Sequence, residues 1–331
     1  MTTYNPKEYR LYIRLSSKKH ILVEGSNDKK IIDRLWHDFA DHTSQTEKLD
    51  EIIIDTAQNL IDFSSAIGSN RVKVETICTM IASKNYATRF VGFVDREWSH
   101  WSGAGIIDLP DYSPLHLIDS LGRLIYSRGH SIENYLFEFE TWSQPLGLLS
   151  ISPIANQALN QFKVVFHEAL GQACVISLAL ADAQLLQRAS DTINEELITL
   201  SANTLEFDFD KWTQKLIQER KIDLEQIKTL KTYYLNYNNL ANKSSPEILR
   251  WLCHGHIGFD FLWATFLKCL KNFSRTSSQN DNATEINYIN KLQRPLIFAN
   301  HWISRAVQNQ TEYPRAIFEL IDCVPTPHAP L

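Results

Sequence analysis

Four short apolar runs, separated by segments of helical periodicity, constrain what the first 130 residues of this chain can form. The runs are 20–23, 51–55, 90–95 and 124–126. Apolar residues at helical spacing follow the first run and the second run. After the first they are Ile31, Ile32, Leu35, Trp36 and Phe39; after the second they are Val74, Ile77, Cys78 and Ile81. Strands that alternate with helices favour parallel pairing through crossover helices. The sequence therefore predicts an α/β fold with a mostly parallel sheet flanked by helices.

A change of pattern near residue 150 indicates a second domain. Residues 155–200 are rich in Ala, Leu, Gln and Glu at helical period, and no proline occurs between Pro153 and Pro246. A chain of 331 residues suggests two domains at about 150 residues each. We expect an α/β domain over 1–145 and a mainly helical domain over 146–331, which would contact substrate or support oligomerisation. The segments 274–284 and 325–330 are expected to be a loop and a fraying tail.

The cysteines and the hydropathy pattern predict a cytoplasmic location and no contact with a membrane. The five cysteines are scattered and include no CxxC pair, as expected for reduced thiols in a core. No uninterrupted apolar run approaches the roughly 18 residues of a membrane span. The polar residues 1–10 lack the apolar stretch of a signal peptide.

Acidic residues follow two of the predicted strands. Glu24 comes directly after the run 20–23, and Asp95 ends the run 90–95. Carboxyl ends of parallel strands meet at one edge of a sheet, where ligands of open α/β folds bind. Glu97 would point the same way as Asp95 if the strand continued, and Glu133 is a fourth candidate. Oxygen ligands of this kind suit Mg²⁺ or Mn²⁺. The alternative is that each of these acids lies on the surface or caps a helix, as Asp28 can.

Three segments resemble a Toprim-like family. The segment 21–28 (ILVEGSND) resembles the first motif of the Toprim fold, an acid and a glycine after a strand, and 93–97 (FVDRE) resembles its second, Asp-x-Asp. The segment 130–135 (HSIENY) is similar to a motif of the Toprim-like group related to overcoming-lysogenization-defect (OLD) nucleases. That group includes effector nucleases of the phage anti-restriction-induced defence system (PARIS). The resemblance covers about residues 15–140, with a weaker match near His254-Gly255-His256.

The resemblance implies a metal-dependent endonuclease, and it implies roles for individual residues. Glu24 would be the general acid/base or a ligand of Mg²⁺ (or Mn²⁺), Asp95 the main ligand, and Glu133 a further ligand. Glu97 stands where Asp is usual, which puts its direct contact with the metal in doubt. Asp28, His130, Arg96 and Arg128 would support the site; His130 is equally explained as a structural histidine, and the arginines as surface ion pairs.

The same resemblance implies an antiphage effector that an ABC-type ATPase sensor holds inactive and that acts as a homodimer. Its substrate would be tRNA, with DNA as the alternative. The chain has no GxxxxGK[ST] motif, so ATP would have to act through that partner. A rival interpretation is a catalytically silent Toprim-like regulatory subunit, which the Glu97 departure keeps open. A primase or topoisomerase fragment is a weaker rival, since neither a nucleophilic-tyrosine domain nor a primase zinc domain is apparent.

Residues 211–250 combine basic and aromatic side chains that suit contact with nucleic acid. We expect substrate contact from Lys228, Lys231, Tyr233 and Tyr234, presented by an asparagine-rich loop over 236–242; the alternative is a solvated helix face with packed tyrosines. His254 and His256 would add a phosphate contact from a turn between helices. The Cys253–His256 segment has no complementary Cys/His pair, which argues against zinc.

The net charge of −5 is unusual for a nucleic-acid enzyme, but its distribution is informative. Residues 1–140 hold 16 Lys and Arg against 20 Asp and Glu, whereas residues 211–250 hold 8 against 4. Two Mg²⁺ ions would offset the acidic excess of the first segment where a phosphate must approach. The distribution is therefore compatible with a nuclease that needs its metal.

Overall fold

The computed structural model describes residues 3–63, 68–99, 122–150, 154–201, 203–274 and 294–321, which form two compact units. The first unit contains the described residues up to Arg96, the segment 122–132 and the segment 302–321. The second contains 97–99 and the described residues from Glu133 to His301.

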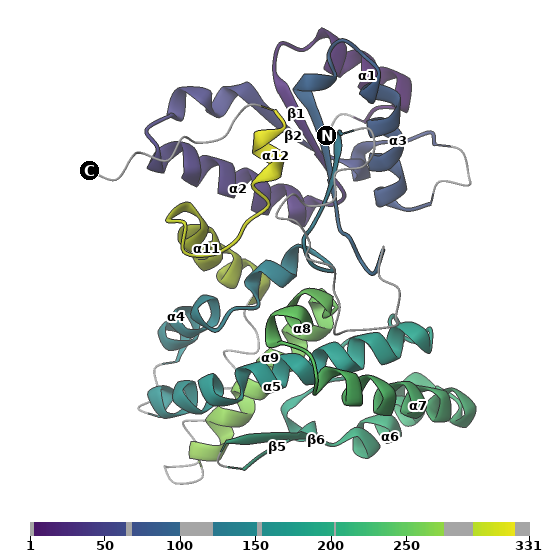
Figure 1. Ribbon diagram of the computed structural model, residues 1–331, viewed down its shortest axis with the longest axis vertical. Coiled ribbons are helices and arrows are strands. Elements are labelled where there is room, and N and C mark those ends of the chain that lie inside the picture. Colours follow the sequence, from purple (N-terminus) through teal and green to yellow (C-terminus); the bar gives the residue numbers. More distant parts are fainter. Residues whose placement is uncertain are drawn as a thin grey trace. The chain divides into compact units, whose positions relative to one another are not determined.

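The first unit is built on a four-stranded parallel sheet (Figure 1). Its strands are β1 (Lys19–Val23), β2 (Ile52–Thr56), β3 (Phe90–Val94) and β4 (Leu124–Tyr126). Their order across the sheet is β2-β1-β3-β4, and every neighbouring pair is parallel. All four predicted strands are confirmed, and so is the predicted α/β class.

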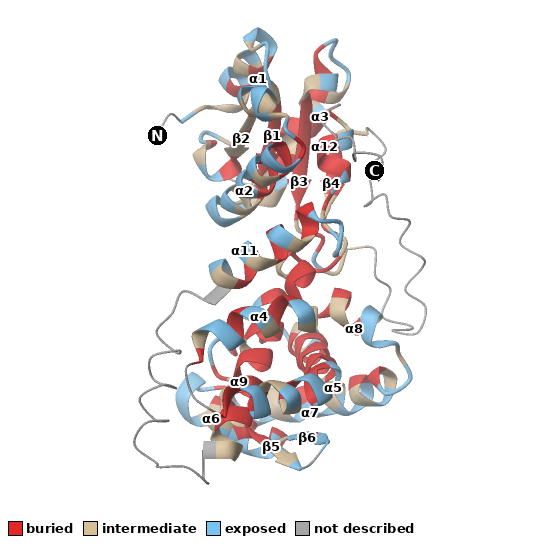
Figure 2. Ribbon diagram, turned by 90° about the vertical axis from the view of Figure 1, so that its left-hand side faces the viewer, coloured by how far each residue is buried: buried red, intermediate tan, exposed pale blue. Residues whose placement is uncertain are grey.

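Helices cover both faces of this sheet. On one face, α1 (Pro6–Leu15) and α3 (Asn70–Ala82) share a buried cluster with the sheet that includes Tyr9, Ile77 and Phe90. On the other face, α2 (Ser26–His42) packs against β1 and β2, and α12 (Ala316–Glu319) packs near β3. Both-face coverage explains why β3 is buried at every position (Figure 2).

Short 3₁₀ turns connect these elements. They are η1 (Thr46–Glu51), η2 (Ala57–Asn59) and η3 (Ala87–Arg89). The helix α3 begins after Ser69, whose hydroxyl accepts from the N–H of Val72, as an N-cap does.

Gly92 allows α3 to approach the centre of the sheet. A Cβ at this position would lie 2.7 Å from Val74 Cγ1 and closer still to Cys78 Sγ. Real Cβ atoms do not come this close, so a larger residue would push α3 away from β3.

The second unit is mainly helical, as predicted, and its centre is the long helix α5 (Ala155–Asp182), which is buried along most of its length (Figure 2). The helices α4 (Phe139–Leu149), α7 (Leu224–Ala241), α8 (Pro246–Leu252) and α9 (Gly255–Ser274) pack against it. The remaining elements are the helix α6 (Phe209–Arg220) and the turns η5 (Ile132–Leu136) and η6 (Glu195–Leu197). The helix α11 (Arg294–Val307) contains the residue at which the second unit ends and the first resumes along the sequence.

Aromatic side chains fill much of the core of this unit. Trp142 stacks on Phe298 with ring centroids 4.3 Å apart and lies 4.9 Å from Phe259, while Phe162 meets Phe166 and Phe266 edge to face. Such rings bury large apolar areas and fix the relative rotation of the helices that carry them.

One element of this half was not predicted from the sequence, and one predicted loop is wrong. Residues 198–207 form an antiparallel hairpin of β5 (Ile198–Ser201) and β6 (Thr204–Phe207), whose alternating apolar residues have the period of a strand. The predicted asparagine-rich loop over 236–242 is the end of α7 and its C-cap, because Leu230, Tyr237 and Ala241 bury one face of that helix. Packing outweighs the low helix propensity of asparagine.

The units divide the chain differently from the expected 1–145 and 146–331. The segment 302–321 lies in the first unit, where Tyr313 and Phe318 contact Phe39 at ring-centroid distances of 4.7 and 6.4 Å. The predicted loop after Ser274 and the predicted tail 325–330 lie outside the described residues.

By length and composition, α5 could cross a membrane, but 67% of its most apolar window is buried inside the structure. That burial is typical of the central helix of a folded core. The four cysteines that the structure describes, Cys78, Cys174, Cys253 and Cys269, are buried thiols, as predicted.

The contact at Gly92 leads to a stability prediction. Gly92→Ala should lower the free energy of unfolding by about 1–3 kcal/mol, because the methyl group overpacks the interface between α3 and β3. Urea denaturation followed by tryptophan fluorescence measures this change. Gly68→Ala is the matched control: apart from its chain neighbours, no atom of the described residues lies within 4 Å of its Cβ position, so we expect a change within about 0.5 kcal/mol. Equal effects of the two substitutions would contradict the packing argument.

Candidate metal centre

Glu24 is the first residue after β1, at the start of α2. Gly25 is the N-cap of α2, and its N–H donates to Asp28 Oδ2 at 2.9 Å. Asp28 therefore caps α2 from position N3 inside the first turn and not as the N-cap residue, and this contact fixes the turn that presents Glu24. The Glu24 side chain is half-buried.

Asp95 follows β3 and is linked directly to Glu24. The N–H of Asp95 donates to Glu24 Oε1 at 2.8 Å, and Asp95 Oδ1 accepts from the N–H of Ile132 at 3.1 Å. One oxygen of each carboxylate is thus held by a backbone N–H, which restricts how each group can rotate. The structure brings these two predicted site residues together.

The pair lies at the point where the order of the sheet reverses. The chain passes from β1 outward to β2 and then returns to place β3 on the other side of β1. In open α/β sheets the loops after two such strands diverge to opposite faces, and ligands bind in the crevice between them at the carboxyl ends. Glu24 and Asp95 are the residues that immediately follow these two strands.

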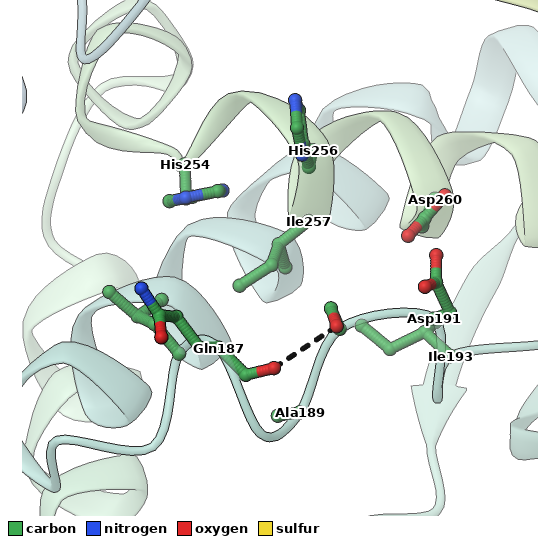
Figure 3. A pocket seen from close by; sticks show the side chains of 10 residues that line it. Gln187, Ala189, Asp191, Ile193, His254, His256, Ile257 and Asp260 are labelled. Carbon is green, nitrogen blue, oxygen red and sulfur yellow. Dashed lines mark hydrogen bonds between the residues drawn. The ribbon is translucent and has the colours of Figure 1, made fainter. Parts of the chain in front are cut away.

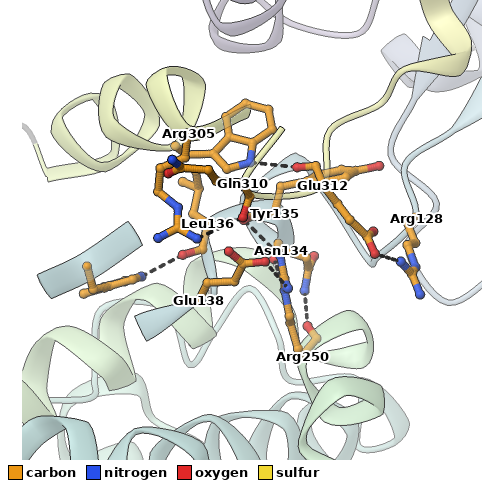
Figure 4. Close-up of polar contacts among 11 residues, drawn as sticks. Arg128, Asn134, Tyr135, Leu136, Glu138, Arg250, Arg305, Gln310 and Glu312 are labelled. Carbon is orange, nitrogen blue, oxygen red and sulfur yellow. Dashed lines mark hydrogen bonds and ion pairs between the residues drawn. The ribbon is translucent and has the colours of Figure 1, made fainter. Parts of the chain in front are cut away.

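Arg96 links the ends of β3 and β4. Its N–H donates to Ser127 Oγ at 3.0 Å, and its Nη1 donates to the carbonyl oxygen of Arg128 at 3.3 Å. The side chain is buried, and burial lowers the pKa of Arg96 to about 10, so the guanidinium stays charged at neutral pH. Arg128 forms an ion pair with Glu312 (Figure 4). Both arginines thus have partners within the first unit. For Arg128 the partner is an ion pair, which is the alternative role that the sequence left open.

Glu97 does not continue β3. The strand ends at Val94, and Glu97 is an exposed residue of the second unit with a left-handed backbone, φ 53°. The expectation that it points the same way as Asp95 along an extended strand is therefore wrong. The turn after β3 removes the alternation on which that expectation depended.

Glu133 lies in η5 of the second unit and faces His256. The distance from His256 Nε2 to Glu133 Oε1 is 3.6 Å. Interaction with this carboxylate raises the pKa of His256, with smaller contributions from Asp260 and Asp191. His130, two residues before η5, is buried in the first unit.

Arg250 of α8 holds η5 in place (Figure 4). Its Nε and Nη2 donate to the carbonyl oxygens of Asn134 and Tyr135 at 3.0 and 3.1 Å, and its Nη1 pairs with Glu138 at 2.8 Å. Asn134 in return donates to the carbonyl oxygens of Arg250 and Cys253. Sequence reasoning did not identify Arg250, because its partners are more than 110 residues away in the sequence.

The predicted substrate residues of α7 have partners within the second unit. Lys228 pairs with Glu225 at 2.6 Å and Lys231 with Asp210 at 2.9 Å, all on the surface. Tyr234 stacks on a phenylalanine at 4.1 Å, and burial raises the pKa of Tyr234 to about 12. Its neighbour Tyr233 is half-buried. The structure thus has a helix face with ion pairs and a packed tyrosine, the alternative that the sequence left open.

Cys253 and His254 form the expected turn between α8 and α9, whereas His256 lies in the first turn of α9 and not in the connection. The N–H of His254 donates to Ser177 Oγ of α5 at 3.1 Å, and His254 and His256 have ring centroids 5.7 Å apart. Cys253 is buried, which raises the pKa of its thiol to about 12. A protonated, buried thiol is a poor zinc ligand.

The described residues contain no group of three or more His, Cys, Asp or Glu side chains arranged to hold a metal ion. The pair formed by Glu24 and Asp95 nevertheless fits Mg²⁺, because this ion is commonly held by one or two carboxylates together with water and substrate phosphate. The donor set consists of hard oxygens, and the backbone N–H contacts fix both groups. Cysteine and histidine, which would favour zinc, do not contribute to it.

The Arg250 contacts lead to a second prediction. Arg250→Lys should reduce the free energy of unfolding by roughly 1–3 kcal/mol, because an ammonium group cannot reproduce a fork that bonds two carbonyls and a carboxylate. Thermal denaturation followed by circular dichroism measures the loss. Arg34→Lys is the matched control, since Arg34 is exposed and forms an ion pair with Asp38 of the same helix, and we expect about 0.5 kcal/mol or less there. An unchanged free energy of unfolding in Arg250→Lys would show that other contacts hold η5 in place.

No family model matches this chain, and no curated protein is similar to it in sequence.

Proposed function

We propose that this chain is a Toprim-like, metal-dependent nuclease that hydrolyses phosphodiester bonds of nucleic acid as an effector of bacterial antiphage defence. The observation that supports this proposal most directly is the pairing of Glu24 with Asp95 at the reversal point of a parallel sheet. The resemblance of the segments around these residues to Toprim motifs gives the same assignment independently.

Glu24 and Asp95 would hold Mg²⁺ or Mn²⁺ through carboxylate oxygens. When bound, such an ion neutralises charge on a phosphate and lowers the pKa of a coordinated water. The chain's own contribution is orientation: the N–H groups of Asp95 and Ile132 each hold one oxygen of the two carboxylates. Glu24 is the residue proposed to exchange a proton with the attacking water or the leaving oxygen. Asp28 supports it by fixing the turn at Gly25.

The further ligands and partners remain part of the proposal. Glu133 and Glu97 are proposed as further ligands of the metal, and Arg96, Arg128 and His130 as residues that support the site. We propose tRNA as the substrate, with DNA as the alternative, an ABC-type ATPase as the sensor that holds the effector inactive, a homodimer as the active form and the cytoplasm as its location. These proposals rest on the family resemblance, and the surface of α7 is the proposed contact for the substrate.

A second candidate is a catalytically silent regulatory subunit of an ATPase complex. The observations in its favour are that Glu97 lies in an exposed turn with a left-handed backbone, and that the described residues contain no group of three potential metal ligands. A regulatory module would need the sheet and its surfaces but no bound metal.

Isosteric amides separate the two candidates. Glu24→Gln and Asp95→Asn keep an oxygen that can accept from the N–H of Asp95 and of Ile132, so the fold should be unchanged. Each should nevertheless reduce Mg²⁺-dependent cleavage by roughly 10²–10³-fold, because several kcal/mol of charge stabilisation is lost at about 1.4 kcal/mol per factor of ten. Cleavage of total tRNA and of plasmid DNA, with the proposed ATPase partner present and triggered, measures the effect.

The matched control is Asp38→Asn, which removes an α2 carboxylate that pairs with the exposed Arg34. Its cleavage rate should equal that of the unmodified chain. Unchanged cleavage in both amide variants would exclude the proposed metal centre. Absence of cleavage in the unmodified chain, together with an unchanged ATPase response in the variants, would favour the silent regulatory subunit.

The surface lysines of α7 provide a separate test of substrate contact. The logarithm of the binding constant for nucleic acid falls linearly with the logarithm of the salt concentration. If Lys228 and Lys231 neutralise phosphates, changing both to Ala should make this slope shallower by about 1–2, since each contact contributes roughly 0.7–0.9. Electrophoretic binding at several salt concentrations measures the slope. Lys18→Ala with Lys84→Ala, two exposed lysines of the first unit, is the control. An unchanged slope would mean that these lysines serve only their ion pairs with Glu225 and Asp210.

A further inference from the structure

The second unit contains a cavity of about 400 Å³ between the start of α9 and the turn that follows α5 (Figure 3). Ligand sites commonly have volumes of about 300–1,000 Å³. Its polar lining includes Asp191, Asp260, His254 and His256, and its apolar lining includes Leu186, Ile193 and Ile257. In Figure 3, Asp191 and Asp260 are turned toward each other, and Ile257 points from α9 into the cavity.

The turn that forms one wall is held firmly. Ser190 Oγ donates to the carbonyl oxygen of Gln187, and Thr192 Oγ1 donates to that of Ala189 while it accepts from Trp212 Nε1 at 2.9 Å. Arg188 donates to the carbonyl oxygens of Arg220 and Lys221. These contacts tie the wall to α6 and to the turn that follows it, so the cavity is present before any ligand binds.

The opposite wall is fixed by the turn between α8 and α9. The N–H of His254 donates to Ser177 Oγ, and Trp98 Nε1 donates to the carbonyl oxygen of Leu252 at 3.0 Å. The Trp98 ring lies 6.1 Å from that of His254. The imidazole therefore has a defined position at the edge of the cavity.

Acidic side chains outnumber basic ones around the cavity. Two carboxylates, of Asp191 and Asp260, line it, and a third, of Glu133, faces His256. These acids raise the pKa of His256, whose positive charge offsets part of the negative charge. Burial, with the nearby His256, lowers the pKa of His254 to about 4, so His254 adds no positive charge at neutral pH. A phosphate in this cavity would meet carboxylates at close range, which argues against the phosphate contact expected of these histidines.

We propose that this cavity binds a guanidinium or alkylammonium group carried on an aliphatic stem. Asp191 and Asp260 face each other and would accept charge-assisted hydrogen bonds from the cation. Leu186, Ile193 and Ile257 supply apolar walls for the methylene groups of the stem. The neutral imidazole of His254 can accept a further hydrogen bond, or it can stack on a planar guanidinium.

Such a group can come from an arginine side chain of another protein or from a free polyamine-like metabolite. The proposal does not depend on nuclease activity, because all the residues that carry it belong to the second unit and none is Glu24 or Asp95. It assigns the cavity a role in recognising a partner or a small cation.

Direct binding to the full chain tests this proposal. Isothermal titration would use N-acetyl-arginine amide as the side-chain mimic, agmatine as the free metabolite, and N-acetyl-citrulline amide as the uncharged analogue. We expect binding of one or both cations and at least roughly tenfold weaker binding of the citrulline compound, since a hydrogen bond to a charged group contributes about 1.5–3 kcal/mol. Preference for the blocked arginine would indicate a protein partner, and preference for agmatine a metabolite.

Asp191→Asn and Asp260→Asn should each weaken binding of the cation by roughly tenfold or more. Asp210→Asn, which removes an exposed carboxylate of α6 outside the cavity, is the control and should bind like the unmodified chain. Circular dichroism checks that each variant is folded. Failure of both cations to bind, equal binding of citrulline, or indifference to both Asp variants would overturn the proposal. Binding of inorganic phosphate that strengthens in Asp260→Asn would also overturn it, in favour of an anion site.

Discussion

The parallel pairing of β1 with β3 is the constraint on which the first unit depends. Its register places Val23 beside Phe93. Glu24, one residue after Val23, and Asp95, two residues after Phe93, are thereby close enough for the N–H of Asp95 to donate to the Glu24 carboxylate. A slip of one residue would turn the side chains of a strand to the opposite faces of the sheet and would separate this pair. Gly92 lies in the same register, and its missing side chain lets α3 pack against the centre of the sheet. Burial and the candidate site therefore depend on the same alignment.

Local pattern was sufficient to predict the strands and the two acids that end them, because a buried parallel strand appears in sequence as a short apolar run with a polar stop. It was insufficient where distant contacts decide the outcome. The asparagines before residue 242 continue α7 because Tyr237 and Ala241 are buried. The return of Phe318 to the first unit depends on a contact with Trp36, nearly the whole chain length away. The orientation of Glu97 was predicted only on the condition that the strand continued; β3 ends at Val94, and the backbone at Glu97 has a positive φ.

Carboxylates serve different purposes in the two units, and net charge alone does not separate them. In the first unit, Glu24 and Asp95 are oriented by backbone N–H groups at a sheet edge, the arrangement expected of ligands for a small, hard cation. In the second unit, Asp191 and Asp260 face each other across a cavity with apolar walls, which suits a larger organic cation. The overall charge of −5 therefore includes carboxylates at two separate places, each of which is proposed to bind a cation. The basic excess of residues 211–250 is partly offset by ion pairs such as that of Lys231 with Asp210.

The choice between a nuclease and a silent module depends on what the hydrogen bonds at the sheet edge require. An N–H donor needs only an oxygen acceptor, which glutamine and asparagine supply as well as glutamate and aspartate do. Two carboxylates held at one edge of a sheet would also repel each other in proportion to their closeness, and a cation bound nearby would offset that repulsion. The hydrogen bonds from Asp95 and Ile132 thus explain the position of the two side chains but not their charge. A bound divalent cation would account for that charge, and this is the physical reason to prefer the proposed nuclease over a module that needs no metal.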